Sequence, residues 1–411
     1  MTMTSFSTRA GAGAADKVEV AGFAALIGFV AAVQFSIAAA QILLTVAIVC
    51  WIAVAILNRE HLEAPSMFWP LVAYAVLTLV STAFSLDPMS SIWRGRQPTG
   101  ETKQLLLFLV VPLVYRLARG PRTSTVVWVV ITAGAVSAAV GILQYGIFEF
   151  DLLGSRLRGT LGHWMTYSGL LMLVSVVALA RALFRRRDRA WPMLVMPALI
   201  VALALTQTRS AWVGLSVAVG LLLLLKDVRL VGLLPVVVAI VIGFAPQSVT
   251  NRFYSIFDPN DPTSRDRVSM LRAGVRIVRD HPLTGVGPNV VGRVYPIYRD
   301  PDAIKKDQPH LHNVVVQIAA ERGLLALGAW FWFIGTLAVQ TGRKFRAGGR
   351  GVLPAAGLGA IVAMLAAGMF EHNFGDSEFL MLFLVIVTLP YAAEWDPRGQ
   401  RQDARAASIA A

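Results

Sequence analysis

The sequence predicts an all-α polytopic membrane protein, and three observations lead to this fold class. First, 56% of the 411 residues are hydrophobic and only 15% are charged, whereas a soluble domain carries roughly 25% charged residues. Second, apolar runs long enough to cross a bilayer recur along the chain. Third, basic residues are distributed unequally between alternate loops. These observations exclude a soluble enzyme, a disordered chain and, with Cys50 as the single cysteine, a disulfide scaffold.

We expect about twelve membrane helices, because each needs about 20 apolar residues. One run, from Gln104 to Tyr115, is short and extends past Arg116 only if that side chain reaches the interface. The other runs lie near 18–35, 37–57, 66–85, 124–146, 165–181, 191–206, 211–225, 230–248, 323–341, 352–371 and 378–394.

The distribution of basic residues predicts that both termini are cytoplasmic. With the N-terminus inside, the tails and inner loops hold 20 of the 37 lysines and arginines, and the short outer loops hold six. The other 11 lie in a long outer segment, which the positive-inside rule discounts. The net charge of +13 then reflects inner loops and anionic ligands or membrane lipids, and no nucleic acid is expected as a partner.

Five regions follow from this topology. We expect a cytoplasmic tail at 1–17, helices one to nine at 18–248, a periplasmic loop at 249–322, helices ten to twelve at 323–394, and a cytoplasmic tail at 395–411. The outer loop is rich in Pro and Gly and has helical periodicity, so we expect it to be folded and to contain the functional site.

An amphipathic helix is predicted after Ser264, which we interpret as its N-cap. Apolar residues recur at helical spacing beside a basic stripe of Arg265, Arg272, Arg276 and Arg279. Such a stripe is typical of a helix on a membrane surface, or of a phosphate-binding site. Arg265 is the strongest phosphate candidate, because it lies at the helix N-terminus.

Two turns in the outer loop need only a structural interpretation. In the stretch from Asp280 to Asn289, Gly285 and Gly287 permit positive φ, and His281 is interpreted as a cap. The pair Asp300 and Asp302 resembles an acidic metal-binding motif, but the proline between them favours a plain turn.

Histidines precede the tenth membrane helix. His310 and His312 are two residues apart and would not share a helix face, so we expect no metal site there. A single histidine at this place can serve as a general base, or as a helix cap. Asn313 follows it directly.

Other polar residues gather at the outer ends of apolar spans. Arg209 lies between two spans, where a charge is costly unless it has a partner or a function. His372 belongs to a polar turn from Glu371 to Asp376, and Arg94 and Arg96 are expected to face the same cavity.

The order of these motifs resembles the O-antigen ligase and polymerase superfamily. The resemblance is carried by Arg-Ser-Ala-Trp at the start of a span, Asp-His-Pro-Leu-Thr-Gly-Val-Gly-Pro in a large outer loop, and His312-Asn313 followed by Gly323. It implies a GT-C-type glycosyltransferase of the bacterial inner membrane that needs no metal or cofactor. Ala326 departs from the pattern of the ligase branch.

The resemblance also implies substrates and residue roles. The donor would be a glycan on undecaprenyl diphosphate, and the acceptor a sugar of the lipid A-core in lipopolysaccharide synthesis. Arg209 and Arg265 would bind the diphosphate and His312 would be catalytic. Direct attack by the acceptor hydroxyl would invert the anomeric centre. An O-antigen polymerase and a protein O-oligosaccharyltransferase remain alternatives, as does a solute transporter from another class.

Overall fold

In the residues that the computed structural model describes, which are 4–92, 101–146, 156–185, 187–244, 247–255, 258, 261–348 and 351–394, all regular secondary structure is helical. Arg94 and Arg96 lie outside these ranges. The α-helices are α1 (Thr4–Ala32), α2 (Ile37–Asn58), α3 (Phe68–Ala83), α4 (Pro88–Ile92), α5 (Val110–Leu117), α6 (Arg122–Gly146), α7 (Trp164–Phe184), α8 (Ala190–Leu205), α9 (Arg209–Lys226), α10 (Leu234–Gly243), α11 (Gln247–Tyr254), α12 (Pro262–Asp280), α13 (Val291–Tyr298), α14 (Val314–Ala347), α15 (Val352–Gly368) and α16 (Ser377–Ala393). The 3₁₀ helices are η1 (Glu101–Leu109), η2 (Gly159–Leu161), η3 (Val228–Leu233) and η4 (Asn373–Gly375).

Five described helices are long and apolar enough to cross a membrane, namely α2, α6, α7, α9 and α14. Shorter apolar helices lie at Phe68–Ala83, Gln104–Leu117, Ala190–Leu205, Val352–Gly368 and Ser377–Ala393. The run expected at 230–248 is divided between η3 and the ten-residue α10. A helix of that length rises about 15 Å, roughly half the apolar thickness of a bilayer.

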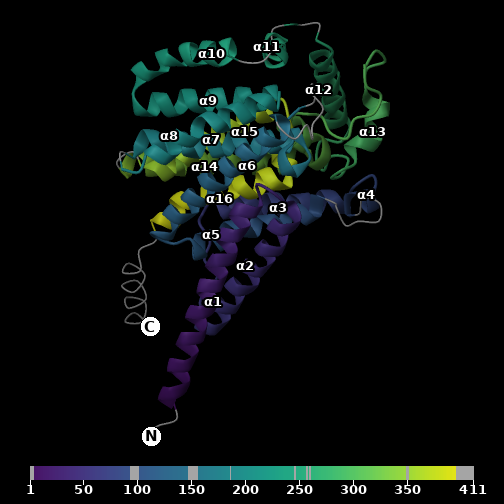
Figure 1. Cartoon of the computed structure of the whole chain (residues 1–411). Helices are drawn as coiled ribbons and strands as arrows, with labels where there is room; N and C mark the ends of the chain where they lie inside the picture. The colour runs from purple at the N-terminus through teal and green to yellow at the C-terminus, as the bar shows by residue number, and fades with distance from the viewer. Residues whose placement is uncertain are drawn as a thin grey trace.

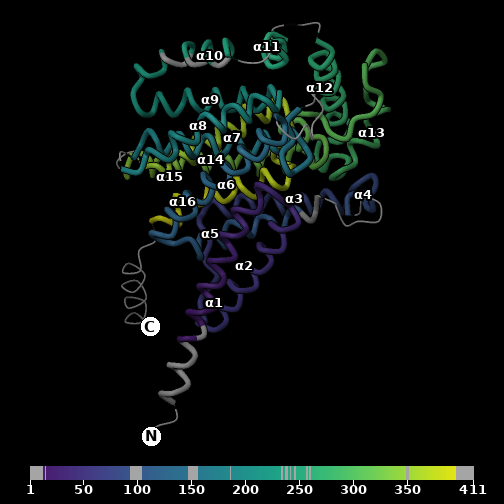
Figure 2. Tube along the Cα trace, in the orientation of Figure 1, coloured from purple at the N-terminus to yellow at the C-terminus, as the bar shows by residue number. Residues whose placement is uncertain are grey.

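The long helices form a bundle around α7 and α16, whose residues are buried over most of their length. Helix α9 packs against α15, and α3 packs against α14, so segments far apart in the chain are neighbours (Figure 2). Trp330, Phe333, Phe379 and Phe383 are fully buried in the shared core. The hairpin of α1 and α2 projects from this bundle, with the N-terminus at its tip (Figure 1).

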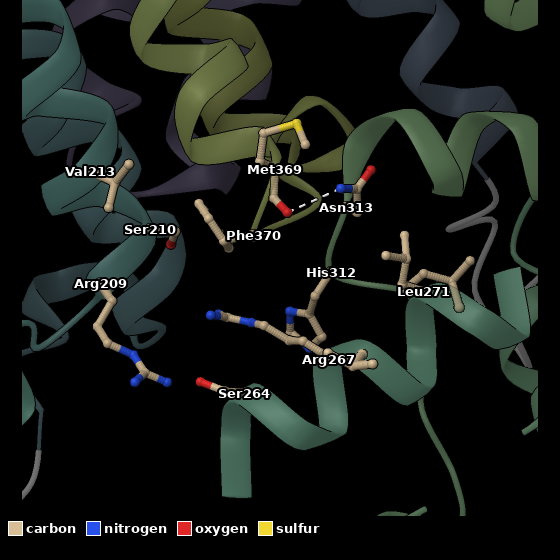
Figure 3. Close-up of a pocket in the computed structure, with 12 residues that line it drawn as sticks. Arg209, Ser210, Val213, Ser264, Arg267, Leu271, His312, Asn313, Met369 and Phe370 are labelled. Atoms are coloured by element: carbon tan, nitrogen blue, oxygen red, sulfur yellow. Dashed lines mark hydrogen bonds between the residues drawn. The ribbon is translucent and has the colours of Figure 1, made fainter. Parts of the chain in front are cut away.

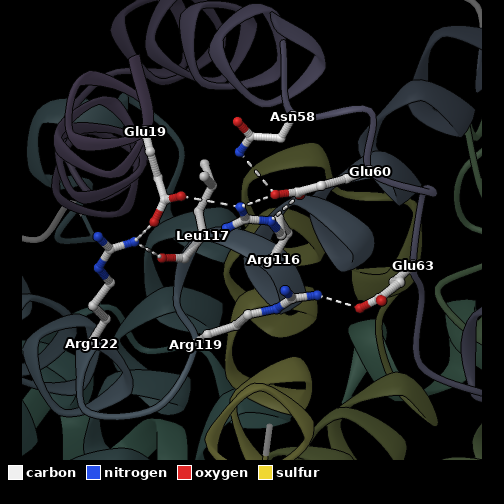
Figure 4. Close-up of polar contacts among 8 residues, drawn as sticks. All are labelled: Glu19, Asn58, Glu60, Glu63, Arg116, Leu117, Arg119 and Arg122. Carbon is white, nitrogen blue, oxygen red and sulfur yellow. Dashed lines mark hydrogen bonds and ion pairs between the residues drawn. The ribbon is translucent and has the colours of Figure 1, made fainter. Parts of the chain in front are cut away.

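Ion pairs fasten α1 and the segment after α2 to α5, to the turn after α5 and to the start of α6 (Figure 4). Arg116 contacts Glu60 at 2.8 Å and Glu19 at 3.1 Å, and Arg122 contacts Glu19 at 2.7 Å. Arg119 pairs with Glu63. Arg116, in the last turn of the short apolar helix α5, is thus paired with two carboxylates.

The segment before α14, which the sequence predicts to be an outer loop, is folded around a second, smaller core. Helices α12 and α13 lie together at one end of the bundle (Figure 1), and Met270, Ile277, Val291 and Tyr295 are buried between them. The helix that the periodicity of this loop predicts is thus confirmed as α12. The predicted cap is wrong: Asp261, not Ser264, caps α12, and its side chain accepts a hydrogen bond from the Ser264 amide at 3.1 Å. Pro262 supplies the fixed φ that favours the first helical position.

Candidate active site

A glycine turn fixes the distance between α12 and α14. After His281, the C-cap of α12, the chain runs along α14 and makes backbone hydrogen bonds from Val286 to Ala320 and from Gly287 to Glu321, each 2.9 Å long. Gly323 interrupts α14 with a φ of +79°, and a Cβ there would overlap the carbonyl group of Leu283. Only glycine fits this contact.

His312 lies just before α14, in a backbone conformation that side chains rarely adopt. Its φ is +50°, and Asn313 then caps α14 by accepting a hydrogen bond from the Val316 amide at 3.0 Å. Asn313 also donates to the Met369 carbonyl at 3.0 Å, so its amide is used in joining α14 to the end of α15. The cap and this contact hold His312 at the mouth of the bundle.

Glu371 orients the imidazole of His312. The distance from Nδ1 of His312 to Oε2 of Glu371 is 3.1 Å, and each side chain is 14% exposed. Burial by itself would raise the pKa of the Glu371 carboxyl, but the hydrogen bond and charge of His312 lower it to about 2. Glu371 is therefore an ionised acceptor, and the pair resembles the base-plus-orienting-group arrangement of many active sites.

His310 and His372 complete a cluster of imidazoles. The ring centroids of His310 and His312 are 4.1 Å apart, and those of His310 and His372 are 6.2 Å apart. Burial, followed by the neighbouring His312, lowers the pKa of His310 to about 3. The sequence argument that placed His310 and His312 on different helix faces was wrong, because both precede the helix and the positive φ of His312 brings the rings together.

Two arginines from different helices reach the space beside His312 (Figure 3). Arg209, the first residue of α9, is 6% exposed and donates to Asp261 at 3.0 Å and to the Ser255 carbonyl at 2.9 Å. Arg267 extends from α12 towards His312. Burial lowers the pKa of Arg267, which means that its charge lies in a poorly solvated place.

Arg209, Arg267 and His312 form the boundary between two cavities. The first, an apolar cavity of about 310 Å³, also has Val213, Leu271 and Phe370 in its wall. The second has a volume of about 450 Å³ and is strongly basic. Any molecule that occupied both cavities would pass these three side chains.

The wall of the basic cavity includes lysine and arginine side chains that the sequence analysis did not assign to the site. Its wall includes Arg156, Arg158, Arg252 and Lys305, together with the Asp266 carboxylate. Arg156 and Arg158 lie over the Trp164 ring at 5.3 and 5.2 Å from its centroid. The pKa of Arg156 is lowered by burial and then by the charge of Arg209. An anion that entered this cavity would relieve such repulsion.

The basic stripe predicted on α12 points away from His312. Arg265 and Arg267 are two residues apart, which is about 200° around a helix, and Arg265 lies in the wall of a different cavity of about 420 Å³. Arg272 and Arg276 bind Asp300 at 3.4 and 2.6 Å, and Arg279 is exposed at the end of the helix. Asp300 thus holds the turn after α13 against α12.

The structure therefore brings together five of the residues singled out from the sequence, namely Arg209, His310, His312, Asn313 and His372, and separates them from the Arg265 stripe. Arg267 and Glu371 were missed as members. The sequence did offer one indication for Glu371. Together with His372 it lies at the end of an apolar span, where an ionisable residue needs a partner or a function.

A sequence model of the family described as O-antigen ligase matches residues 192–331. No curated protein matches the chain. The matched segment includes Arg209, Arg267 and His312, whereas Glu371 lies beyond its end. It also includes the glycine turn and Gly323, which position α12 against α14. The family resemblance predicted from the motifs is thereby confirmed over this segment.

Proposed function

Because residues 192–331 match the sequence model of the O-antigen ligase family, we propose that this chain is an O-antigen ligase. In this proposal it transfers a glycan from undecaprenyl diphosphate to a sugar hydroxyl of lipid A-core. The observation that carries the proposal is the His312–Glu371 pair beside Arg209 and Arg267, at the boundary of a basic and an apolar cavity.

The charge of the donor assigns it to the basic cavity. A lipid diphosphate is anionic, and guanidinium groups bind its oxygens through two parallel hydrogen bonds. Arg209 and Arg267 are the two arginines shared by both cavities, so we assign them to the phosphate nearest the scissile bond. Arg267 takes the role that the family resemblance had suggested for Arg265. The apolar cavity then receives the first part of a lipid chain.

His312 acts as the general base in this mechanism. The Nδ1–H group donates to Glu371, which leaves the lone pair of Nε2 to accept the proton of the acceptor hydroxyl. As the hydroxyl oxygen bonds to the anomeric carbon, the bond from that carbon to the phosphate oxygen breaks. Arg209 and Arg267 stabilise the charge that develops on the leaving diphosphate. A single displacement of this kind inverts the anomeric centre.

The membrane arrangement is part of the proposal. In this proposal η3 and α10 together form the ninth of twelve spans, both termini are cytoplasmic, and residues 249–322 lie in the periplasm at the inner membrane, as in a GT-C-type enzyme. Asp302 is exposed in this loop, so a cysteine placed there in a Cys50→Ser background should react with an impermeant maleimide in spheroplasts. Protection of that cysteine until the membrane is permeabilised would contradict the orientation.

Transfer with defined substrates tests the function. Purified protein should move a radiolabelled glycan from undecaprenyl diphosphate to lipid A-core, and excess EDTA should not reduce the rate, because the arginines replace a metal ion. Parallel reactions with a second lipid-linked glycan and with an acceptor protein test the polymerase and the protein-glycosylating alternatives. Transfer to either of these but not to lipid A-core would overturn the ligase assignment.

A further inference from the structure

His310, His312 and Glu371 form a compact group of metal-ligand side chains. One ligand atom from each lies within 4.8 Å of the other two. Nδ1 of His312 and Oε2 of Glu371 are 3.1 Å apart. The two imidazole rings meet edge to face at an angle of 61°. Tetrahedral zinc sites use this set of ligand types, with nitrogen at about 2.0–2.1 Å and carboxylate oxygen at about 2.0–2.2 Å from the ion.

The backbone holds this group in place before any ligand arrives. The amide of Leu311, between the two histidines, donates to the Gln317 side chain at 2.7 Å. Asn313 anchors the next residue to α14 and to Met369. On the other side, the His372 amide donates to Glu371 at 3.1 Å. Neither segment has to refold to bring the three ligand atoms around one ion.

His310 supplies an observation that is independent of the spacing. Its Nδ1 atom is buried, and among the described residues it has no hydrogen-bond partner. Buried polar atoms in folded proteins are normally satisfied, so an exception points to a missing partner. A ring nitrogen in this position, beside a second imidazole and a carboxylate, is suited to bind a cation directly.

We propose that His310, His312 and Glu371 bind a divalent transition-metal ion, Zn²⁺ above others, and that this ion inhibits the enzyme. Imidazole nitrogen favours Zn²⁺, Cu²⁺ and Ni²⁺, whereas Mg²⁺ prefers six oxygen ligands. Water completes the tetrahedral coordination from the cavity side. The guanidinium groups of Arg209 and Arg267 repel a cation, so we expect weaker binding than at a structural zinc site.

The inhibition rests on the proposed function, although the binding does not. An ion bound between Nδ1 of His312 and Glu371 replaces their hydrogen bond. A neutral imidazole that coordinates a metal through Nδ1 carries its proton on Nε2. That nitrogen then has no lone pair to accept the proton of the acceptor hydroxyl. The bound ion thus removes both the base and the contact that orients it.

Direct binding of Zn²⁺ to purified full-length protein in detergent tests the site. Chelator-treated protein is titrated with Zn²⁺ in competition with a chromophoric zinc chelator. We expect one ion per chain, and more than about a tenfold loss of affinity in His310→Ala and in His310→Gln, because even residues outside the ligand set change metal affinity by that factor. His281→Ala is the matched control. This histidine is the C-cap of α12 and is not one of the three ligand residues, so the variant should bind Zn²⁺ as the wild type does. Equal affinity in wild type and both His310 variants, or no stoichiometric binding at all, would overturn the proposal.

The transfer assay separates this inference from the proposed function. Zn²⁺ should inhibit the wild type, EDTA should restore the rate, and Mg²⁺ should have no effect. The two His310 variants should need more Zn²⁺ for half-inhibition, measured against their own metal-free rates. Zinc binding without any glycan transfer would leave the site standing and remove the function. Glycan transfer by a protein that binds no zinc through His310 would support the function and overturn the metal site.

Discussion

Nδ1 of His312 lies 3.1 Å from Oε2 of Glu371, although the two residues are 59 positions apart in the chain. His312 precedes α14, and Glu371 follows α15. Their contact turns a single histidine into an oriented base. It also makes Glu371 a positioning residue, whose effect is expected to appear in turnover and pH dependence.

Glu371→Gln should lower kcat by about 10–100-fold while leaving the KM for the donor nearly unchanged, because positioned acid–base groups supply roughly 10²–10⁴-fold. The pKa of Glu371 is about 2, so the carboxylate is ionised throughout the working range. Loss of its negative charge disfavours a protonated imidazole, so the acid limb of the kcat profile should move to lower pH. Asp280→Asn, an exposed acid at the end of α12, is the control. An unchanged kcat and profile in Glu371→Gln would remove its positioning role.

Arg267→Ala should reduce transfer by about 10²–10³-fold, the effect of removing one donor that stabilises transition-state charge. Arg267→Lys should also be impaired, because lysine lacks the planar fork. Arg265→Ala is a matched control two residues away on the opposite face of α12, and should remain close to wild type. The measurement is the initial rate of glycan transfer by each of the three variants. An inactive Arg265→Ala with an active Arg267→Ala would reverse the assignment.

Inorganic pyrophosphate should inhibit transfer by competing with the donor diphosphate in the basic cavity, and added salt should weaken that inhibition. Lys305→Ala should raise the inhibition constant several-fold, since Lys305 lies in the wall of this cavity. Lys306→Ala removes the same charge from the next residue, which is exposed and does not line the cavity. Equal effects of the two substitutions would indicate only a general attraction of anions to a basic surface.

Gly323→Ala should destabilise the protein strongly. The new Cβ would overlap the Leu283 carbonyl, and alanine at a φ of +79° costs about 1–3 kcal/mol by itself. Gly328→Ala, five residues further along the same helix, meets no atom within 4 Å and should unfold at the wild-type temperature. Thermal unfolding of the purified variants provides the comparison. A Gly323→Ala protein as stable as Gly328→Ala would show that the turn does not fix α12 against α14.

The sequence predicted the features that depend on local pattern. Apolar runs predicted helices, periodicity predicted that the segment before α14 is folded, and the residue type alone indicated that Gly285 and Gly287 can adopt the positive φ that they have. It could not identify which face of α12 meets α14, since that depends on the backbone contacts between the turn at 282–287 and residues 320–324 of α14. A basic stripe therefore drew attention to Arg265 instead of Arg267.

The histidine cluster shows a second limit of sequence reasoning. Helical register separates residues i and i+2, but His312 has a left-handed backbone conformation before the helix begins. That conformation, and the approach of Glu371 from the end of α15, are products of tertiary packing. The sequence around His312 and the sequence around Glu371 therefore could not predict that the two side chains pair.

The rate of glycan transfer by His312→Ala tests most directly whether His312 is the general base. Purified variant and wild type are compared with undecaprenyl-diphosphate-linked glycan and lipid A-core in excess EDTA, and donor binding is measured on the same samples. We predict that turnover falls by about 10²–10⁴-fold, whereas donor affinity stays close to that of the wild type because Arg209 and Arg267 remain. Transfer by His312→Ala at the wild-type rate, with normal donor binding, would contradict the assignment of His312 as the general base.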